Sequence, residues 1–193
     1  VAGFNFGKMK REDGKVEKLG YTVTAYANEE QPDWIKSIQQ GVDSSLPSQG
    51  IQRSIANQVP VALGNMNTVV LNKKALAEGE IALQVFSEYF GPLPHNQLTI
   101  SQQTASNFGQ SWPTLVWLPL TYFLDSTTRH GLGMSDAYAY FKVVAPHEVA
   151  HQWWGHTVGF SSYRDQWMSE GFADASASIY LQAVYAKEPQ RYL

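Results

Sequence analysis

The stretch His147-Glu148-Val149-Ala150-His151 is followed by Glu170, with residues 152–169 between them. An α-helix turns once every ~3.6 residues, so His147 and His151 project from the same face, one turn apart. Two imidazoles placed in this way can bind one metal ion, and a carboxylate that opens a second helix is the natural third ligand. Zinc prefers such nitrogen and oxygen donors, and a catalytic zinc site keeps its fourth position for water. The pattern therefore predicts one Zn²⁺ ion bound by His147, His151 and Glu170.

Glu148 adjoins the two histidines on the rim of the same helix face. Zinc lowers the pKa of its bound water from about 15.7 to about 7. Glu148 is placed to take that proton and to return it to a leaving group, as a general base and acid. The alternative is that a polar helix face carries these residues by chance. The second acidic helix at this spacing argues against chance.

Three further side chains are candidates for the surroundings of the metal. Asp174, one helical turn after Glu170, can accept the second N–H of a metal-bound histidine, or can be an ordinary solvated carboxylate. Asp165 is a weaker candidate for the same role. His156 competes with Glu170 as third ligand, but it lies beyond Gly155, where we expect the helix to end.

The spacing of the histidines and the glutamate resembles that of the aminopeptidase N and leukotriene hydrolase family of gluzincin metallopeptidases. The likeness extends to three flanking stretches: Trp167-Met168-Ser169-Glu170-Gly171-Phe172-Ala173, His151-Gln152-Trp153-Trp154-Gly155 and Tyr89-Phe90-Gly91-Pro92-Leu93-Pro94. It covers residues 78–186 well and residues 1–27 loosely. The resemblance implies hydrolysis of peptide bonds, with a peptide as substrate and an N-terminal residue as the site of cleavage. A zinc endopeptidase and a zinc-binding module without catalysis are the alternatives, and Glu148 favours an enzyme because holding zinc does not require it.

The resemblance also implies an α+β fold with a zincin-like (thermolysin-like) catalytic domain. In this interpretation residues 1–27 are the end of a preceding β-rich domain and residues 28–73 form a connecting segment. Residues 74–193 are then the N-terminal part of the metallopeptidase domain.

Two features of the family are missing from this sequence. The catalytic tyrosine that steadies the oxyanion lies beyond the last residue here, so we expect the 193-residue chain alone to be poorly active. Where the family has a G-A-M-E-N segment, this chain has Gly109-Gln110-Ser111-Trp112-Pro113. The family's glutamate binds the free ammonium of the substrate, and the neutral Gln110 cannot balance that charge. Some preference for free N-termini should therefore be lost.

Composition limits the possible functions. At 44% hydrophobic and 16% charged residues the chain can bury a core, and disorder is not expected. A net charge of −3 without a basic run argues against binding to nucleic acid or to an anionic membrane. No apolar stretch approaches the ~20 residues of a membrane span. The absence of cysteine leaves the cellular compartment undetermined. The first residue, Val1, suggests that the chain is a piece of a longer polypeptide. The remainder of that polypeptide is then its expected partner.

Periodicity and turn residues predict the secondary structure around the site. We expect strands at residues 1–10 and 19–26 around a turn at Asp13-Gly14, a helix at 72–90, and strands at 98–100 and 114–120. We also expect a short helix, capped within residues 30–33, that carries Trp34, Ile35, Ile38 and Val42. The run 112–118 is either core or the edge of a substrate cleft.

The two helices that carry the ligands have less regular signals. Ser135 or Asp136 is expected to cap the first of them, with a kink or a new helix start at Pro146. Ser169 is expected to cap the second. Its inward face should consist of Phe172, Ala175, Ile179 and Ala183.

Overall fold

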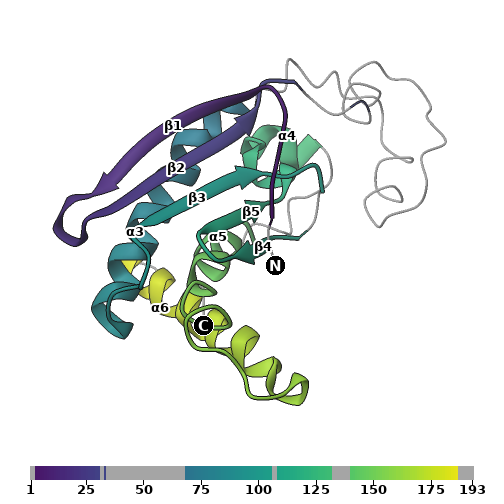
Figure 1. The fold of residues 1–193 in the computed structure, drawn as a ribbon. Helices are drawn as coiled ribbons and strands as arrows, with labels where there is room; N and C mark the ends of the chain where they lie inside the picture. Colours follow the sequence, from purple (N-terminus) through teal and green to yellow (C-terminus); the bar gives the residue numbers. More distant parts are fainter. Residues whose placement is uncertain (1–2, 31–32, 34–67, 106–107, 132–139, 187–193) are drawn as a thin grey trace.

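The computed structural model describes residues 3–30, 33, 68–105, 108–131 and 140–186. Its centre is a five-stranded sheet in the order β1-β2-β3-β5-β4, with helices α3 and α5 behind it (Figure 1). The strands are β1 (Met9–Val16), β2 (Tyr21–Asn28), β3 (Gln97–Gln102), β4 (Gln110–Trp112) and β5 (Leu115–Leu118). The helices are α3 (Asn72–Phe90), α4 (Ser126–Gly131), α5 (Tyr140–Ala150) and α6 (Trp167–Val184). Single 3-10 turns occupy Glu17–Leu19, Val69–Leu71, Leu120–Phe123 and Tyr163–Asp165.

Strands β1 and β2 form an antiparallel hairpin, but its turn is not at Asp13-Gly14. Those two residues lie inside β1, where Gly14 pairs with Val23 of β2. The chain reverses instead at Glu17–Leu19 and Gly20, whose φ of 70° is the left-handed conformation that glycine adopts without strain. A Cβ at Gly14 would meet the end of the flexible Glu80 side chain on α3.

The middle of the sheet is parallel, and its last strand is an edge. Strand β3 pairs in parallel with both β2 and β5, whereas β4 pairs antiparallel with β5. The connection between β4 and β5 is short because Thr114 takes a φ of 65°, the left-handed region that a β-branched residue rarely enters. The apolar run 112–118 thus contributes to the hydrophobic core and to the edge strand of the sheet. Val116 and Leu118 are buried, and Trp112 ends the edge strand β4.

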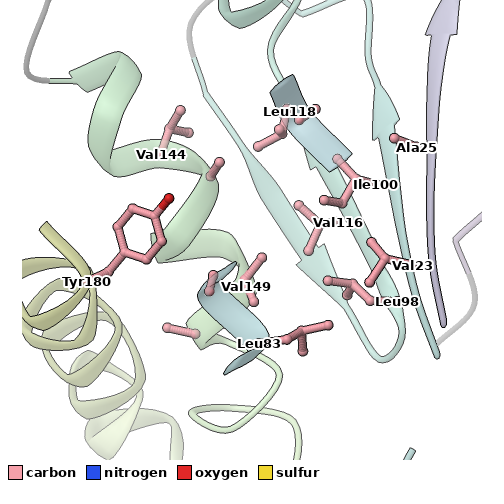
Figure 2. Close-up of a cluster of buried hydrophobic side chains, with 14 of the residues drawn as sticks. Val23, Ala25, Leu83, Leu98, Ile100, Val116, Leu118, Val144, Val149 and Tyr180 are labelled. Atoms are coloured by element: carbon pink, nitrogen blue, oxygen red, sulfur yellow. The ribbon is translucent and has the colours of Figure 1, made fainter. Parts of the chain in front are cut away.

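One hydrophobic core lies between the sheet and the helices. Alternate residues of β2, β3 and β5 point to the same face, as a strand requires. Figure 2 shows the sheet side chains facing Leu83 of α3 and Val144 and Val149 of α5, with Tyr180 of α6 on the other side of α5. The sheet contributes Val23, Ala25, Leu98, Ile100, Val116 and Leu118, none more than 1% exposed. The site helices are therefore fixed to the sheet by burial.

Helix α3 has its expected bounds, residues 72–90. Its buried face consists of Asn72, Ala75, Glu78, Gly79, Ala82, Leu83, Phe86 and Ser87. Tyr89 remains 64% exposed, because the buried face follows residues 75, 79, 82, 83 and 86.

Helix α5 runs through Pro146 without a new start, so that half of the expectation was wrong, whereas the alternative, a kink, stays a prediction. A proline inside a helix lacks the N–H for one hydrogen bond. Here Val144, Ala145 and Pro146 are themselves buried, and their packing holds the turn. The regular helix ends at Ala150, before Gly155, and tight turns follow. The expected caps Ser135 and Asp136 lie outside the described residues, as do Trp34 and its expected helix.

Helix α6 begins at Trp167, so Ser169 is inside the helix and not its cap. The hydroxyl of Ser169 donates back to the Gln166 carbonyl at 3.0 Å. The expected inward face was also wrong: Phe172 is 51% exposed. The buried face consists of Ser169, Ala173, Ser176, Ala177, Tyr180 and Leu181.

Strands β1 and β2 share one sheet with β3 and β5, and no finding tests the expected division into residues 1–27, 28–73 and 74–193. That division stays a prediction. Within the described residues, none of the helices has the length and the apolar character required to cross a bilayer.

Replacing Leu83 by Ala should test the core. Leu83 is fully buried between α3 and the sheet, so a cavity is expected to reduce the free energy of unfolding by roughly 2–5 kcal/mol. Ile81, two residues earlier on the same helix, is 40% exposed, and Ile81→Ala is the matched control. Urea denaturation of both metal-free variants measures the difference. Equal losses would contradict this account of the core.

Candidate metal centre

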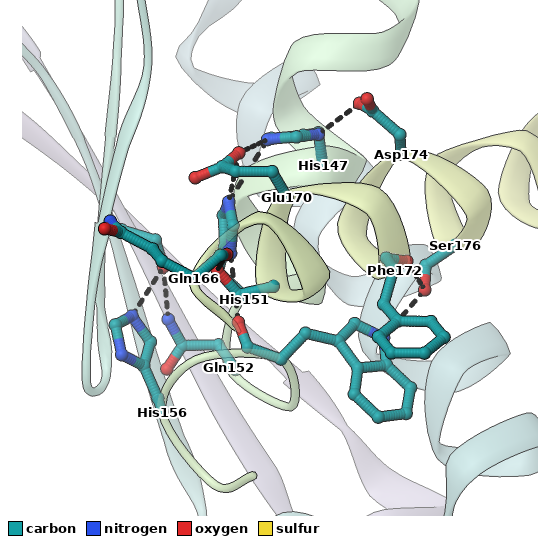
Figure 3. Close-up of polar contacts among 12 residues, drawn as sticks. His147, His151, Gln152, His156, Gln166, Glu170, Phe172, Asp174 and Ser176 are labelled. Carbon is teal, nitrogen blue, oxygen red and sulfur yellow. Dashed lines mark hydrogen bonds and ion pairs between the residues drawn. The ribbon is translucent and has the colours of Figure 1, made fainter. Parts of the chain in front are cut away.

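His147 and His151 meet at the end of α5 (Figure 3). His147 lies in the last turn of the helix, and the backbone N–H of His151 still donates to the His147 carbonyl at 3.3 Å. The two Nε2 atoms are 3.1 Å apart, and the rings are nearly perpendicular, at 85°. The i, i+4 spacing therefore brings both imidazoles to one point, as the sequence predicts.

Glu170 reaches the same point from the first turn of α6. Its Oε2 lies 3.2 Å from Nε2 of His147 and 3.4 Å from Nε2 of His151. Helices α5 and α6 pack against each other, and Ala150 of α5 and Ala173 of α6 are both fully buried. Within the described residues, His147, His151 and Glu170 form the group of side chains able to hold a metal ion.

The remaining ring nitrogens have partners that can only accept hydrogen bonds. Nδ1 of His147 lies 2.8 Å from Oδ1 of Asp174, and Nδ1 of His151 lies 3.0 Å from the Trp154 carbonyl oxygen. Each Nδ1 must therefore carry a proton and donate it. In a neutral imidazole this leaves a lone pair on Nε2, which is the atom that faces Glu170.

When both rings are neutral, lone pairs on the two Nε2 atoms and on Oε2 of Glu170 therefore converge, and no proton lies between them. A tetrahedral zinc site with bonds of ~2.0–2.1 Å has donor atoms roughly 3.3 Å apart. The observed separations of 3.1, 3.2 and 3.4 Å agree with that value. The donor types, their separations and their tautomers therefore fit a zinc ion.

Glu148 lies beside the ligands but is not one of them. Its side chain is buried, and burial, followed by the charge of Glu170, raises the pKa of the Glu148 carboxyl to about 8. Gly109, just before β4, approaches so closely that a Cβ there would collide with the Glu148 carboxylate. A side chain at position 109 would displace that carboxylate, so glycine is required here for space.

A comparison with known protein families gives a match. A model of the peptidase family M1 domain matches residues 114–191, which include both histidines and Glu170. This part of the chain is therefore similar to the peptidase family M1 domain. The resemblance drawn from the metal-binding pattern is thereby confirmed.

The chain is also similar to much longer proteins. Endoplasmic reticulum aminopeptidase 2 of Bos taurus is 32% identical over 106 residues, which are 53% of this chain and 11% of that protein. Aminopeptidase M1-A of Oryza sativa subsp. japonica is 29% identical over 107 residues, 50% of this chain and 12% of that protein. The chain therefore spans about a tenth of the length of these curated relatives.

A solved structure has a similar fold. The M1 zinc metallopeptidase from Deinococcus radiodurans superimposes with a TM-score of 0.54 at 19% sequence identity. The match covers 96% of this chain and 31% of that one. At this identity the likeness concerns the fold alone: a mixed α/β arrangement with a small sheet.

His156 does not join the ligand group. Its Nε2 lies 3.3 Å from the Ser111 hydroxyl on β4. Burial, together with the nearby His151, lowers the pKa of the His156 imidazole. The ring is turned toward the edge strand, whereas Glu170 faces the two histidines.

The two candidate carboxylates differ in position. Asp174 contacts His147, as described above, whereas Asp165 accepts hydrogen bonds from the hydroxyls of Ser161 and Ser162 at 3.1 and 2.8 Å. Asp165 therefore belongs to its own turn. Gln110 is exposed at the start of β4.

Gln152 was not singled out from the sequence, although it connects the metal helix to the edge strand. Its buried amide donates to the Ser111 hydroxyl at 2.8 Å and to the Trp112 carbonyl at 2.9 Å, and it accepts from the Thr114 N–H at 2.8 Å. These bonds satisfy the strained turn between β4 and β5. Its position directly after His151 is the signal that sequence reasoning passed over.

Asp174→Asn should weaken zinc binding by about 10-fold, because a neutral amide orients and polarises the imidazole of His147 less than a carboxylate does. Asp165→Asn is the matched control and should leave the zinc dissociation constant unchanged. Competition with a fluorescent chelator measures both constants. Similar constants for the two variants would remove Asp174 from this role.

Proposed function

We propose that the protein is a zinc metallopeptidase of the aminopeptidase type. The observation that carries the proposal is that Nε2 of His147, Nε2 of His151 and Oε2 of Glu170 converge on one point. Asp174 and the Trp154 carbonyl accept hydrogen bonds from the two Nδ1 atoms and so fix the tautomers of both imidazoles. The similarity of residues 114–191 to the peptidase family M1 domain supports the same conclusion. Because the chain spans 11% of a curated relative, the activity is proposed for the whole protein to which this part belongs.

His147, His151 and Glu170 would hold the zinc ion, and Asp174 and the Trp154 carbonyl would keep the two imidazoles in their metal-binding tautomers. Bound zinc supplies a water molecule of lowered pKa and an electrophile for the scissile carbonyl. The zinc site is thus built from two helices of this chain.

Glu148 would act as the general base and then as the general acid. Its carboxylate would accept a proton from the attacking water and pass it to the nitrogen of the leaving amine. In the metal-free chain its pKa of about 8 reflects burial and the charge of Glu170. A cation bound by Glu170 would offset the charge of Glu170 and so lower the pKa of Glu148. The carboxyl of Glu148 would then favour its ionised form, which can accept a proton.

The finer fold assignment belongs to the same proposal. We propose a zincin-like domain whose first part is residues 74–193, preceded by residues 28–73 as a connecting segment and 1–27 from a β-rich domain. The mixed sheet beside α5 and the Glu170-bearing α6 support it. The rest of the parent polypeptide would supply the oxyanion-stabilising tyrosine.

An endopeptidase is the second candidate, and Gln110 is the observation that favours it. A charge-assisted hydrogen bond is roughly twice as strong as a neutral one. A neutral amide on the edge strand would therefore hold a free ammonium less strongly than a carboxylate. We rank the aminopeptidase first because a carboxylate outside strand β4 can bind the free ammonium of the substrate in place of Gln110.

Glu148→Gln should abolish hydrolysis in the full-length protein and leave zinc bound. Loss of a general base costs roughly 10²–10⁴-fold in rate. Zinc content stays at the wild-type level because Glu148 is not a ligand. Glu88→Gln makes the same chemical change at an exposed position of α3 and is the control. Loss of zinc from the Glu148 variant would reassign Glu148 as a ligand or a structural support.

Peptide pairs that differ only in N-acetylation test where the full-length protein cuts. Since Gln110 offers no charge, we expect kcat/KM for the free peptide to exceed that for its acetylated twin only modestly, with measurable cleavage of the latter. The ratio is obtained from initial rates. A ratio of many thousands would mean that an anchoring carboxylate exists elsewhere in the protein.

A further inference from the structure

The Nδ1 atoms of His147 and His151 have different kinds of hydrogen-bond partner. His147 lies within α5 and contacts a side chain of α6, whereas His151 lies just past Ala150 and contacts only a main-chain carbonyl, that of Trp154. The N–H groups of Gln152 and Trp153 bond back three residues, to Val149 and Ala150, and the N–H of Trp154 also donates to the Ala150 carbonyl, at 3.0 Å. The direction of His151 therefore depends on what fixes the loop at Trp154.

The Trp154 indole is fixed by α6. Its Nε1–H donates to the Ser176 hydroxyl at 2.9 Å, and that hydroxyl donates to the Phe172 carbonyl at 2.7 Å (Figure 3). The indole ring contacts Phe172 and, from α3, Phe90, each with a centroid separation of 5.1 Å. Ser176 is only 2% exposed, so water does not compete for this bond.

Gly155 completes the geometry on the other side of Trp154. Its φ of 104° is closed to most side chains, and its N–H donates to the Val158 carbonyl at 2.8 Å. The peptide that carries the Trp154 carbonyl is thus fixed by the indole on one side and by this turn on the other.

We infer that Ser176 is a positioning residue for the zinc ligand His151, acting through the indole and the carbonyl of Trp154. The inference rests on the proposed zinc site and assigns α6 a third contribution to it. Glu170 supplies a ligand, Asp174 orients His147, and Ser176 orients His151. Helix α6 would then fix both histidines as well as its own carboxylate.

The test is the zinc dissociation constant of the whole chain. Ser176→Ala removes the acceptor of the indole N–H, and Trp154→Phe removes the donor while keeping an aromatic ring between Phe90 and Phe172. Partners outside the ligand shell are worth 10–100-fold in metal affinity, so each variant should weaken zinc binding by about 10-fold. Because both break one bond, the double variant should be no weaker than either single one.

Ser178→Ala is the matched control. Ser178 lies on the same helix, and its hydroxyl makes the same backward bond, to the Asp174 carbonyl at 3.1 Å. Its removal should leave the dissociation constant within about twofold of wild type.

A cobalt spectrum separates positioning from simple destabilisation. With Co²⁺ in place of zinc, Ser176→Ala and Trp154→Phe should shift the visible absorption bands, and Ser178→Ala should not. Lower melting temperatures of the metal-free variants, with wild-type zinc constants and cobalt spectra, would overturn the inference. A wild-type chain that binds no zinc would overturn the proposed metal centre as well, so the two failures are distinguishable.

Discussion

The structure depends on one electrostatic constraint, the meeting of three lone pairs at the contact of α5 and α6. Nε2 of His147, Nε2 of His151 and Oε2 of Glu170 lie 3.1–3.4 Å from one another. Because Asp174 and the Trp154 carbonyl accept from the other ring nitrogens, no proton relieves this arrangement while both rings are neutral. A bound cation relieves it.

The rest of the fold holds those atoms in place against this repulsion. The hydrophobic core anchors α5 to the sheet, and Ala173 and Tyr180 of α6 are buried in the same core. Gln152 joins the metal helix to the edge strand β4, and Gly109 leaves space for Glu148. The site thus sits where two helices and the open edge of the sheet meet.

Helical periodicity explains why the ligands were predictable. The i, i+4 spacing of His147 and His151 fixes their common direction whatever surrounds them, and helix α3 was likewise evident from its apolar period. Two other features depend on tertiary contacts. The Asp13-Gly14 pair resembles a turn, but both residues pair with β2 inside strand β1. The partner of His151 is a main-chain carbonyl, which leaves no signature in the sequence.

Anomalous X-ray diffraction from zinc-loaded crystals, recorded on both sides of the zinc absorption edge, tests the central claim most directly. The account predicts a single strong peak per chain, in contact with Nε2 of His147, Nε2 of His151 and a carboxylate oxygen of Glu170. A peak bound by His156 in place of Glu170, or no peak between α5 and α6, would contradict it.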